Sequence, residues 1–234
     1  MNQRDIFLHD WSGRAYSLDT RESFRRFVIN PHPIEPNVGY LCACPSVPPR
    51  VRGKSSPLSR MIMAPFFEIV ARHQLPPASV DVVFASRFGE IRVLETLLEA
   101  IYSGEALSPL DFCNSVHHTP TGYLSIAAKN QGISRTVSAG ELTFGAALLE
   151  TWQLLATGRS QRVVLLCGDE SVPDFFIPGE KHEFAFGMAL LFGIEKQTQD
   201  DEEIVPFNAI YATGRQAVTA FDWLRNRYCT NGEK

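Results

Sequence analysis

The chain has 234 residues, of which 44% are apolar and 21% are charged, and this globular composition argues against disorder, collagen and coiled coil. Its 22 Lys and Arg stand against 26 Asp and Glu, and the formal net charge of −4 gives no basis for nucleic-acid binding. No segment approaches the ~20 consecutive apolar residues that span a bilayer, and the length fits one α/β domain over residues 1–234.

The N-terminus and the cysteines indicate the expected compartment. Arg4, Asp5 and Asp10 interrupt the first ten residues and argue against a signal peptide, so we expect a cytoplasmic protein. The five cysteines are odd in number and irregularly spaced, which does not fit a disulfide framework. Cys42 and Cys44 lack the spacing of a zinc or redox pair, so we expect two partly buried thiols in a strand and no metal.

Proline dominates the segment that follows the first thirty residues. Seven prolines over residues 31–57 predict irregular structure with only short regular elements. Positive charge gathers at Arg50, Arg52, Lys54 and Arg60. This cluster belongs either to a solvated loop or to a patch that docks an acidic partner. Apolar residues at helical spacing then predict a helix over residues 59–72.

Strand and helix patterns follow one another through the middle of the chain. β-Branched residues predict a buried strand over residues 80–86, and an amphipathic helix is expected over residues 91–100. A shorter helix over 123–128 and a strand over 133–137 come next. These elements lead into the most apolar helix of the chain.

Residues 142–157 give the strongest helix prediction, because apolar side chains recur at helical spacing on nearly every face. Such a helix is buried between two layers, and Gly158 is placed to end it. The remaining expected elements are strands over residues 162–167 and 184–195, a solvated acidic turn at 200–203 and a last helix over about 215–228.

Ser138 and Glu141 occupy the turn between a predicted strand and this long helix. The N-terminus of a helix stabilises a nucleophile or an oxyanion, but here the turn offers a carboxylate, which is a poor acyl acceptor. The alternative is structural. Ser138 and Glu141 fit a capping box, with Ser138 as the N-cap, which stabilises a helix by about 1 kcal/mol.

Two pairs of adjacent polar residues are further candidates. His117 and His118 point in different directions because they are neighbours, and loop histidines that bond the backbone are the commoner outcome. Asp169 and Glu170 follow a strand, where α/β folds collect functional groups, but they also diverge, and we expect turn carboxylates. The motifs of serine hydrolases, P-loops and dinucleotide-binding folds are absent from the sequence.

Several segments together carry a family resemblance. Residues 107–170 read LSPLDFCNSVHHTPTGYLSIAAKNQGISRTVSAGELTFGAALLETWQLLATG and, three residues later, RVVLLCGDE. This stretch resembles the N-terminal half of β-ketoacyl synthases, which have the thiolase fold, and the resemblance extends over residues 58–195. It implies an α/β fold with a mixed β-sheet flanked by helices, one buried central helix, and no C-terminal half.

Two departures from the family bear on activity. Counting back from Gly158, the nucleophilic cysteine of the family falls on Glu141. The family also takes two histidines from its C-terminal half, whereas the six histidines of this chain all precede Glu183. The resemblance therefore implies no catalytic residue, no cofactor and no condensing activity for this chain alone.

This pattern resembles a chain-length-factor-type subunit of the kind found with aryl polyene and type II polyketide ketosynthases. The implied partners are a complete β-ketoacyl synthase, as a heterodimer, and an acyl carrier protein, transiently. The implied interface or tunnel-wall residues are Phe112, Val116, His117, His118 and Tyr123. The residues with which the carrier protein would dock are Arg50, Arg52, Lys54 and Arg60.

The apolar helix over residues 142–157 agrees with an obligatory partner. Uncovered apolar surface costs ~25 cal/mol per Å². The free-energy cost of a bare face of a few hundred Å² is therefore comparable with the net stability of a domain. Either other elements of this chain or another protein must cover it.

Two alternatives stay open. Related domains with glutamine at the nucleophile position decarboxylate malonyl-carrier protein, so Glu141 could act similarly with His117 or His118 as proton donor. In a binding or scaffolding module, by contrast, Ser138 and Glu141 would only cap a helix.

Overall fold

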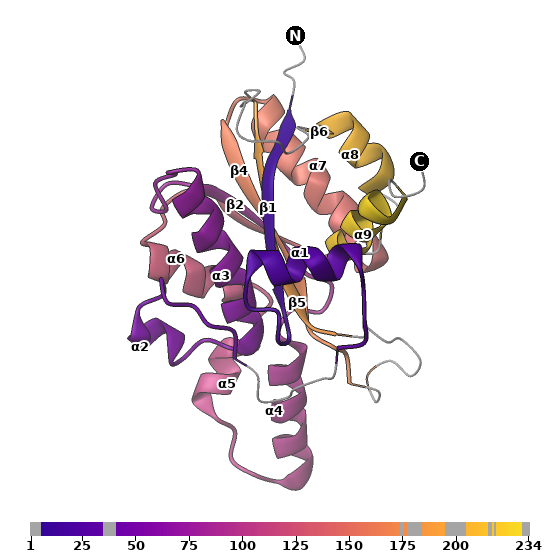
Figure 1. The fold of residues 1–234 in the computed structure, drawn as a ribbon. Helices are drawn as coiled ribbons and strands as arrows, with labels where there is room; N and C mark the ends of the chain where they lie inside the picture. The colour runs from indigo at the N-terminus through magenta and orange to yellow at the C-terminus, as the bar shows by residue number, and fades with distance from the viewer. Residues whose placement is uncertain are drawn as a thin grey trace.

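A computed structural model describes residues 6–34, 41–173, 176, 184–194, 205–214, 217 and 219–230, without the side chains of 205–209, 214 and 227–230. Its centre is a six-stranded mixed sheet in the order β3-β2-β4-β5-β1-β6 (Figure 1). The strands are β1 Phe7–Ala15, β2 Asp81–Ala85, β3 Ser134–Val137, β4 Arg162–Asp169, β5 Phe186–Gly193 and β6 Val205–Pro206. β3, β2 and β4 run parallel, and β5 and β1 are antiparallel to their neighbours.

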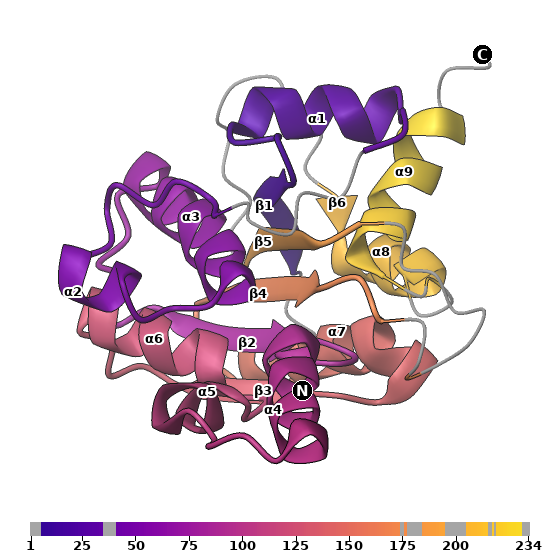
Figure 2. The ribbon, with the colours of Figure 1, turned by 90° about the horizontal axis from the view of Figure 1, so that it is seen from below.

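Helices cover both faces of this sheet (Figure 2). They are α1 Arg21–Ile29, α2 Pro49–Arg52, α3 Pro57–Arg72, α4 Ile91–Ser103, α5 Pro109–Asn114, α6 Thr119–Ala128, the 3₁₀-helix η1 Gly140–Leu142, α7 Thr143–Ala156, α8 Phe207–Gly214 and α9 Ala220–Thr230. α3 and α6 pack on one face of the sheet, and α1, α7, α8 and α9 pack on the other.

The central strands alternate between two apolar cores. Val163 and Leu165 of β4 face α7, whereas Val164 and Leu166 face α3. Because both faces are buried, β4 and β5 read as continuous apolar runs in the sequence. The predicted mixed sheet flanked by helices is therefore confirmed.

The boundaries of most predicted elements agree to within a few residues, whereas β1 and α1 were not predicted. Two further details differ. Cys42 and Cys44 are buried, but they lie in irregular chain and not in a strand. The last helix begins at Ala220, and a separate helix, α8, precedes it. The acidic turn expected at residues 200–203 and part of the expected helix, residues 215, 216 and 218, lie outside the described residues.

α7 is the expected buried helix, and elements of this chain cover it on all but one side. Its inner face packs on β2 and β4. α8 lies beside it, and the rings of Phe144 and Trp223 are 5.9 Å apart. Leu142, just before α7, is 65% exposed and Leu149 is 47% exposed. The C-terminal helices of the chain thus cover one flank of α7, while an outer apolar stripe stays open.

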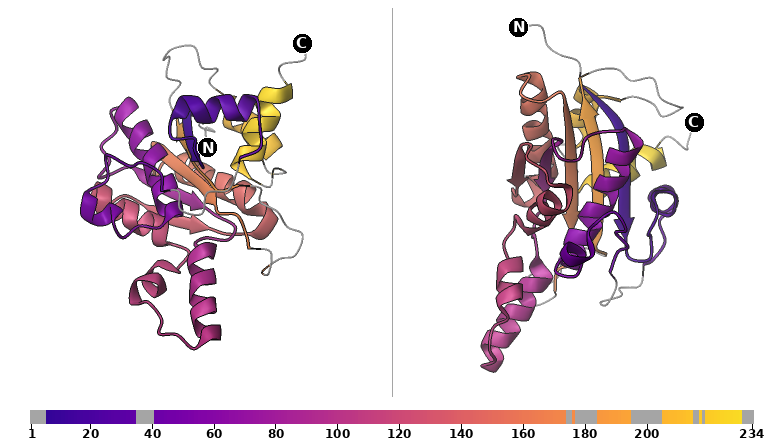
Figure 3. Two further views of the ribbon diagram at one scale, coloured as in Figure 1. Left: turned by 60° about the horizontal axis from the view of Figure 1, so that its bottom comes forward. Right: turned by 90° about the vertical axis from the view of Figure 1, so that its left-hand side faces the viewer.

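α4 and α5 form a hairpin that projects from the body, here called the arm (Figure 3). α4 packs mainly against α5 rather than against the sheet. Asn114, where α5 returns to the body, ties the second root of the arm, because its amide donates to Lys54 O at 3.1 Å and accepts from the Tyr123 hydroxyl at 2.8 Å. The arm is therefore held at its two roots and open along its length.

Gly187 allows α3 to approach the sheet closely. A Cβ atom at this position would lie 2.4 Å from the backbone oxygen of Met61. We expect Gly187→Ala to lower the free energy of unfolding by about 1–3 kcal/mol, because α3 must move away from β5. Urea denaturation followed by circular dichroism measures this change.

Gly122→Ala is the matched control. Gly122 lies in α6, and a Cβ atom added to it would meet no neighbouring atom within 4 Å. Alanine is the better helix former, so this change should raise stability by up to about 1 kcal/mol. Equal effects of the two substitutions would contradict close packing at Gly187.

Candidate functional site

The carboxyl ends of the parallel strands β2, β3 and β4 meet at one edge of the sheet. Each strand is followed by polar chain: residues 86–90 after β2, 138–141 after β3 and 170–171 after β4. Ligand sites of α/β folds form at such an edge. It contains the predicted residues Ser138 and Glu141, with His117 bonded to its rim, and is therefore the candidate site.

Asp169 organises this edge from the last position of β4. Its buried carboxylate accepts hydrogen bonds from Ser86 Oγ at 2.7 Å, from the backbone N–H of Phe88 at 2.9 Å and from that of Arg87 at 3.1 Å. Ser86 Oγ in turn accepts from the N–H of Gly89 at 2.8 Å. The carboxylate thereby fixes the loop between β2 and α4.

The capping box predicted for Ser138 and Glu141 is not formed. Ser138 Oγ donates to Arg87 O at 3.2 Å and so bonds the neighbouring loop. Thr143 makes the local contacts instead: its Oγ1 accepts from the N–H of Ala139 at 2.9 Å and donates to Gly140 O at 2.6 Å. The left-handed conformation of Gly140, with φ of +59°, turns the chain so that η1 precedes α7.

Glu141 lies in η1, at the start of α7, and its side chain is exposed. Among the described residues it makes no hydrogen bond and no ion pair that would hold it in one position. A carboxylate in this setting is solvated, and nothing adjacent would activate it as a nucleophile.

The two histidines serve different elements. His117 Nε2 donates to Ser86 O at 2.9 Å, and its ring packs over Gly89. His118 Nδ1 lies 2.6 Å from Thr136 Oγ1 of β3 and 2.9 Å from Thr121 Oγ1 of α6. Neither imidazole bonds Glu141, so the pair connects α6 to β2 and β3.

Asp169 and Glu170 diverge, as expected for neighbours, but both are buried and neither is a solvated turn carboxylate. Glu170 faces Glu90, a residue that the sequence analysis did not single out. Burial raises the pKa of Glu90 to about 7 and that of Glu170 to about 8. An acidic residue before a helix is usually solvated, so the sequence contains no signal that distinguishes Glu90.

The predicted interface residues divide between surface and interior. Phe112 is 66% exposed and Val116 is 58% exposed, and His118 is also exposed. Tyr123 is half-buried, and its hydroxyl bonds Asn114 below the arm. Phe112 and Val116 are therefore the exposed apolar residues of this predicted set.

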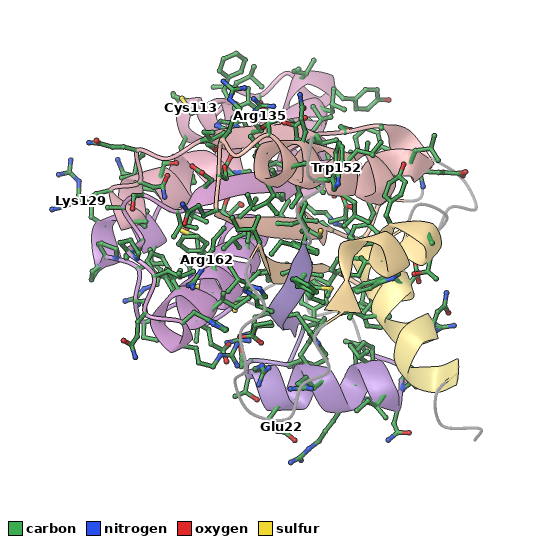
Figure 4. The ribbon with its side chains drawn as sticks, turned by 90° about the horizontal axis from the view of Figure 1, so that it is seen from above. Glu22, Cys113, Lys129, Arg135, Trp152 and Arg162 are labelled. Carbon is green, nitrogen blue, oxygen red and sulfur yellow. The ribbon has the colours of Figure 1, made fainter. Side chains whose placement is uncertain are left out.

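Exposed apolar side chains are frequent on the elements before and after β3. Among the described strands β3 pairs with β2 alone, α7 packs beside it, and His118, just before α6, bonds its Thr136. The exposed apolar side chains of the arm, of α6 and of the start and outer side of α7 are Leu94, Leu98, Ile101, Tyr102, Leu107, Leu110, Phe112, Val116, Ile126, Leu142 and Leu149. We call this edge and these side chains the β3 face. In Figure 4, Cys113 of α5 and Arg135 of β3 lie on the side opposite Glu22 of α1.

The basic cluster is partly internal. Arg52 donates to Cys44 O at 3.1 Å, and Arg60 donates to Arg52 O at 2.6 Å, so these half-buried groups hold the chain before α3. Arg50 and Lys54 are exposed and offer their charges to solvent. Within the described residues, no group of three or more His, Cys, Asp or Glu is arranged for a metal ion.

The described helices include none long and apolar enough to span a membrane. A sequence profile for the N-terminal domain of β-ketoacyl synthases matches residues 28–217. The chain belongs to this family. No significant match is found among curated proteins.

Solved structures show the same fold. A chain of the ketosynthase ApeO in complex with its chain length factor ApeC, from Xenorhabdus doucetiae, has a TM-score of 0.72 at 23% identity and covers 96% of this chain and 92% of its own. The ishigamide ketosynthase/chain length factor has a TM-score of 0.65 at 14% identity, and the match covers 97% of this chain and 81% of the other. A β-ketoacyl synthase from Burkholderia phymatum has a TM-score of 0.62 at 9% identity, and the match covers 82% of this chain and 59% of the other. The chain is therefore thiolase-like.

Asp169→Asn tests the organisation of the edge. The amide keeps one acceptor and places a donor against N–H groups, so we expect the free energy of unfolding to fall by about 2–4 kcal/mol in chemical denaturation. Glu141→Gln is the matched control, because Glu141 is exposed, and its effect should stay within about 0.5 kcal/mol. A neutral effect of Asp169→Asn would show that the loop does not depend on this carboxylate.

Proposed function

We propose that this chain is a non-catalytic, chain-length-factor-type subunit that pairs with an active β-ketoacyl-acyl-carrier-protein synthase in polyene or fatty-acid-type chain elongation. In this proposal residues 1–234 form one domain, and the heterodimer works in the cytoplasm and receives acyl carrier protein transiently. The observation that carries the proposal is the β3 face, the open edge of β3 among the described strands together with the exposed apolar side chains of its neighbouring elements.

The β3 face has the properties of an obligatory interface. An open strand edge presents unpaired N–H and C=O groups, and soluble proteins usually cover or charge such an edge. Here one ion pair, Arg135 with Glu150, lies at the edge, and the exposed side chains of the neighbouring elements include Phe112 at 66%, Ile126 at 65% and Leu142 at 65% exposure. A second sheet pairing along β3 would satisfy the backbone groups and bury these side chains in one step.

The neighbouring structures support the choice of partner. The first two compared structures are described as ketosynthases with chain length factors. Another, with a TM-score of 0.61, is described as an acyl-carrier protein in complex with its ketosynthase. For this chain we infer the same kinds of partner, with exposed Arg50 and Lys54 as the contacts for an acidic carrier protein.

The setting of Glu141 supports a non-catalytic role. Its acyl adduct would be a labile anhydride, and no described histidine bonds it. In the alternative, a malonyl-carrier-protein decarboxylase, Glu141 would need a proton donor, whereas His117 and His118 bond Ser86 and Thr136.

Incubation with malonyl-carrier protein should therefore give the same slow background release of CO₂ with the native chain and with Glu141→Ala. Glu141-dependent acetyl product would establish the decarboxylase instead.

Charge on the β3 face should prevent pairing. We expect co-expression with a cognate ketosynthase to yield a stable heterodimer, and the double variant Phe112→Asp, Val116→Asp to weaken it at least about tenfold, because two buried contacts become desolvated charges. Size-exclusion chromatography and calorimetric titration measure the loss.

Ile29→Asp is the control for this experiment. Ile29 is 46% exposed at the end of α1, on the side of the molecule opposite the arm (Figure 2). This variant should bind the ketosynthase as the native chain does. Retention of full affinity by the double variant would place the interface elsewhere.

A further inference from the structure

Two buried glutamates meet where the arm leaves the body. Glu90 directly precedes α4, and Glu170 directly follows β4. Glu90 is 2% exposed and Glu170 is 1% exposed. Carboxyl groups are rarely buried so completely without a positive partner. They lie at one of the two roots of the arm, where α4 follows the sheet.

The hydrogen bonds of this pair are incomplete. Glu90 Oε1 accepts from Ser56 Oγ at 2.6 Å and from Ser59 Oγ at 2.9 Å, both at the start of α3. Glu90 Oε2 is buried, and the described residues give it no hydrogen-bond partner. Glu170 Oε2 accepts only a long bond, 3.4 Å, from the N–H of Arg92. The pair therefore lacks the donors that two buried carboxylates require.

No cation bonds either carboxyl group within the described residues. The guanidinium of Arg92, the nearest one, donates to Glu95 Oε2 and to Ser171 Oγ, each at 2.8 Å. The titratable and charged groups that face the pair are Tyr16 after β1, Arg92 of α4, Tyr123 of α6 and Asp169 of β4. The two phenols are neutral, and the carboxylate of Asp169 adds to the negative charge.

Two ionised carboxylates are therefore unfavourable here. Desolvation by burial is the largest cause that raises the pKa of each group, and the charge of Glu90 further raises the pKa of Glu170. Because the groups interact, they release their protons as a pair.

We propose that Glu90 and Glu170 form a proton-binding latch that fastens the arm to the sheet, and that the arm loosens when the pair loses its protons. A bound proton removes a buried charge and supplies an O–H donor to a cluster that lacks donors. The neutral pair can then pack between α3, α4 and β4. Ionisation draws water to the root of α4, where the N–H of Arg92 bonds Glu170 at the end of β4.

The sign of the pH dependence follows from the two states of the chain. In the unfolded chain both groups ionise near the ordinary value of 4.5, whereas the folded chain keeps its protons up to pKa values of about 7 and about 8. Between these limits the folded state binds more protons, so the free energy of unfolding falls as pH rises from about 4.5 to about 8. If the chain pairs as proposed above, ketosynthase affinity should fall over the same range, because the arm lies in the β3 face.

Glutamine variants of the full chain test the latch, because glutamine copies the neutral form of the carboxyl group. The melting temperature of the native chain should fall by roughly 10 °C between about pH 5 and about pH 9. In Glu170→Gln and Glu90→Gln the fall should be about half as large, and Glu170→Gln should exceed the native chain in stability at the alkaline end. Glu141→Gln, at an exposed carboxyl, should follow the native curve.

Infrared spectroscopy gives a second readout that does not depend on stability. The native chain should show the carbonyl absorption of a protonated carboxyl at neutral pH and lose it on alkaline titration, with faster amide exchange in α4 and α5. The double Gln variant should lack this absorption. Glutamine variants with an unchanged pH profile, or a native chain without that band, would overturn the latch. Because these measurements need no partner, they distinguish failure of the latch from failure of the proposed pairing.

Discussion

Two-sided burial of β4 and β5 is the constraint on which the other features of the chain depend. These strands carry apolar side chains to both faces, so a layer of helices must cover each face. Polar groups are consequently displaced to the strand ends, where Asp169 binds the loop after β2 and Glu170 meets Glu90. Both the candidate site and the root of the arm therefore lie at the carboxyl edge of one sheet.

The sequence predicted the elements whose burial follows a simple pattern and missed those stabilised by polar contacts. β1 was missed because its core positions include Asp10 and Arg14. The carboxylate of Asp10 binds Arg21, Arg72 and His73, and Arg14 binds Glu68. These partners lie up to about sixty residues away, so no local pattern reveals that such polar residues are satisfied inside a sheet.

In the candidate site, residue spacing correctly predicted where side chains lie along the chain, but it did not predict which groups they bond. Counting from Gly158 placed Glu141 at the start of the long helix, and the structure has it there. The capping box failed because Ser138 Oγ bonds Arg87 O of the neighbouring loop, and a 3₁₀ turn held by Thr143 separates Ser138 from the start of α7. Glu90 could not be found, since its burial depends on Ser56, Ser59 and Glu170, which come from distant segments.

The pairing of β1 has a consequence for how the chain reaches this fold. Phe7 of β1 lies opposite Gly193 of β5, and Ala15 lies opposite Phe186. On the ribosome, β1 must therefore wait until β5 has been synthesised before it finds its neighbour. Contacts this far apart in sequence make folding slow, because loop closure precedes the gain from burial. Until β5 is made, the edge of β1 that it will pair lacks its neighbour, and so do the side chains of Leu8 and Trp11 that the finished fold buries.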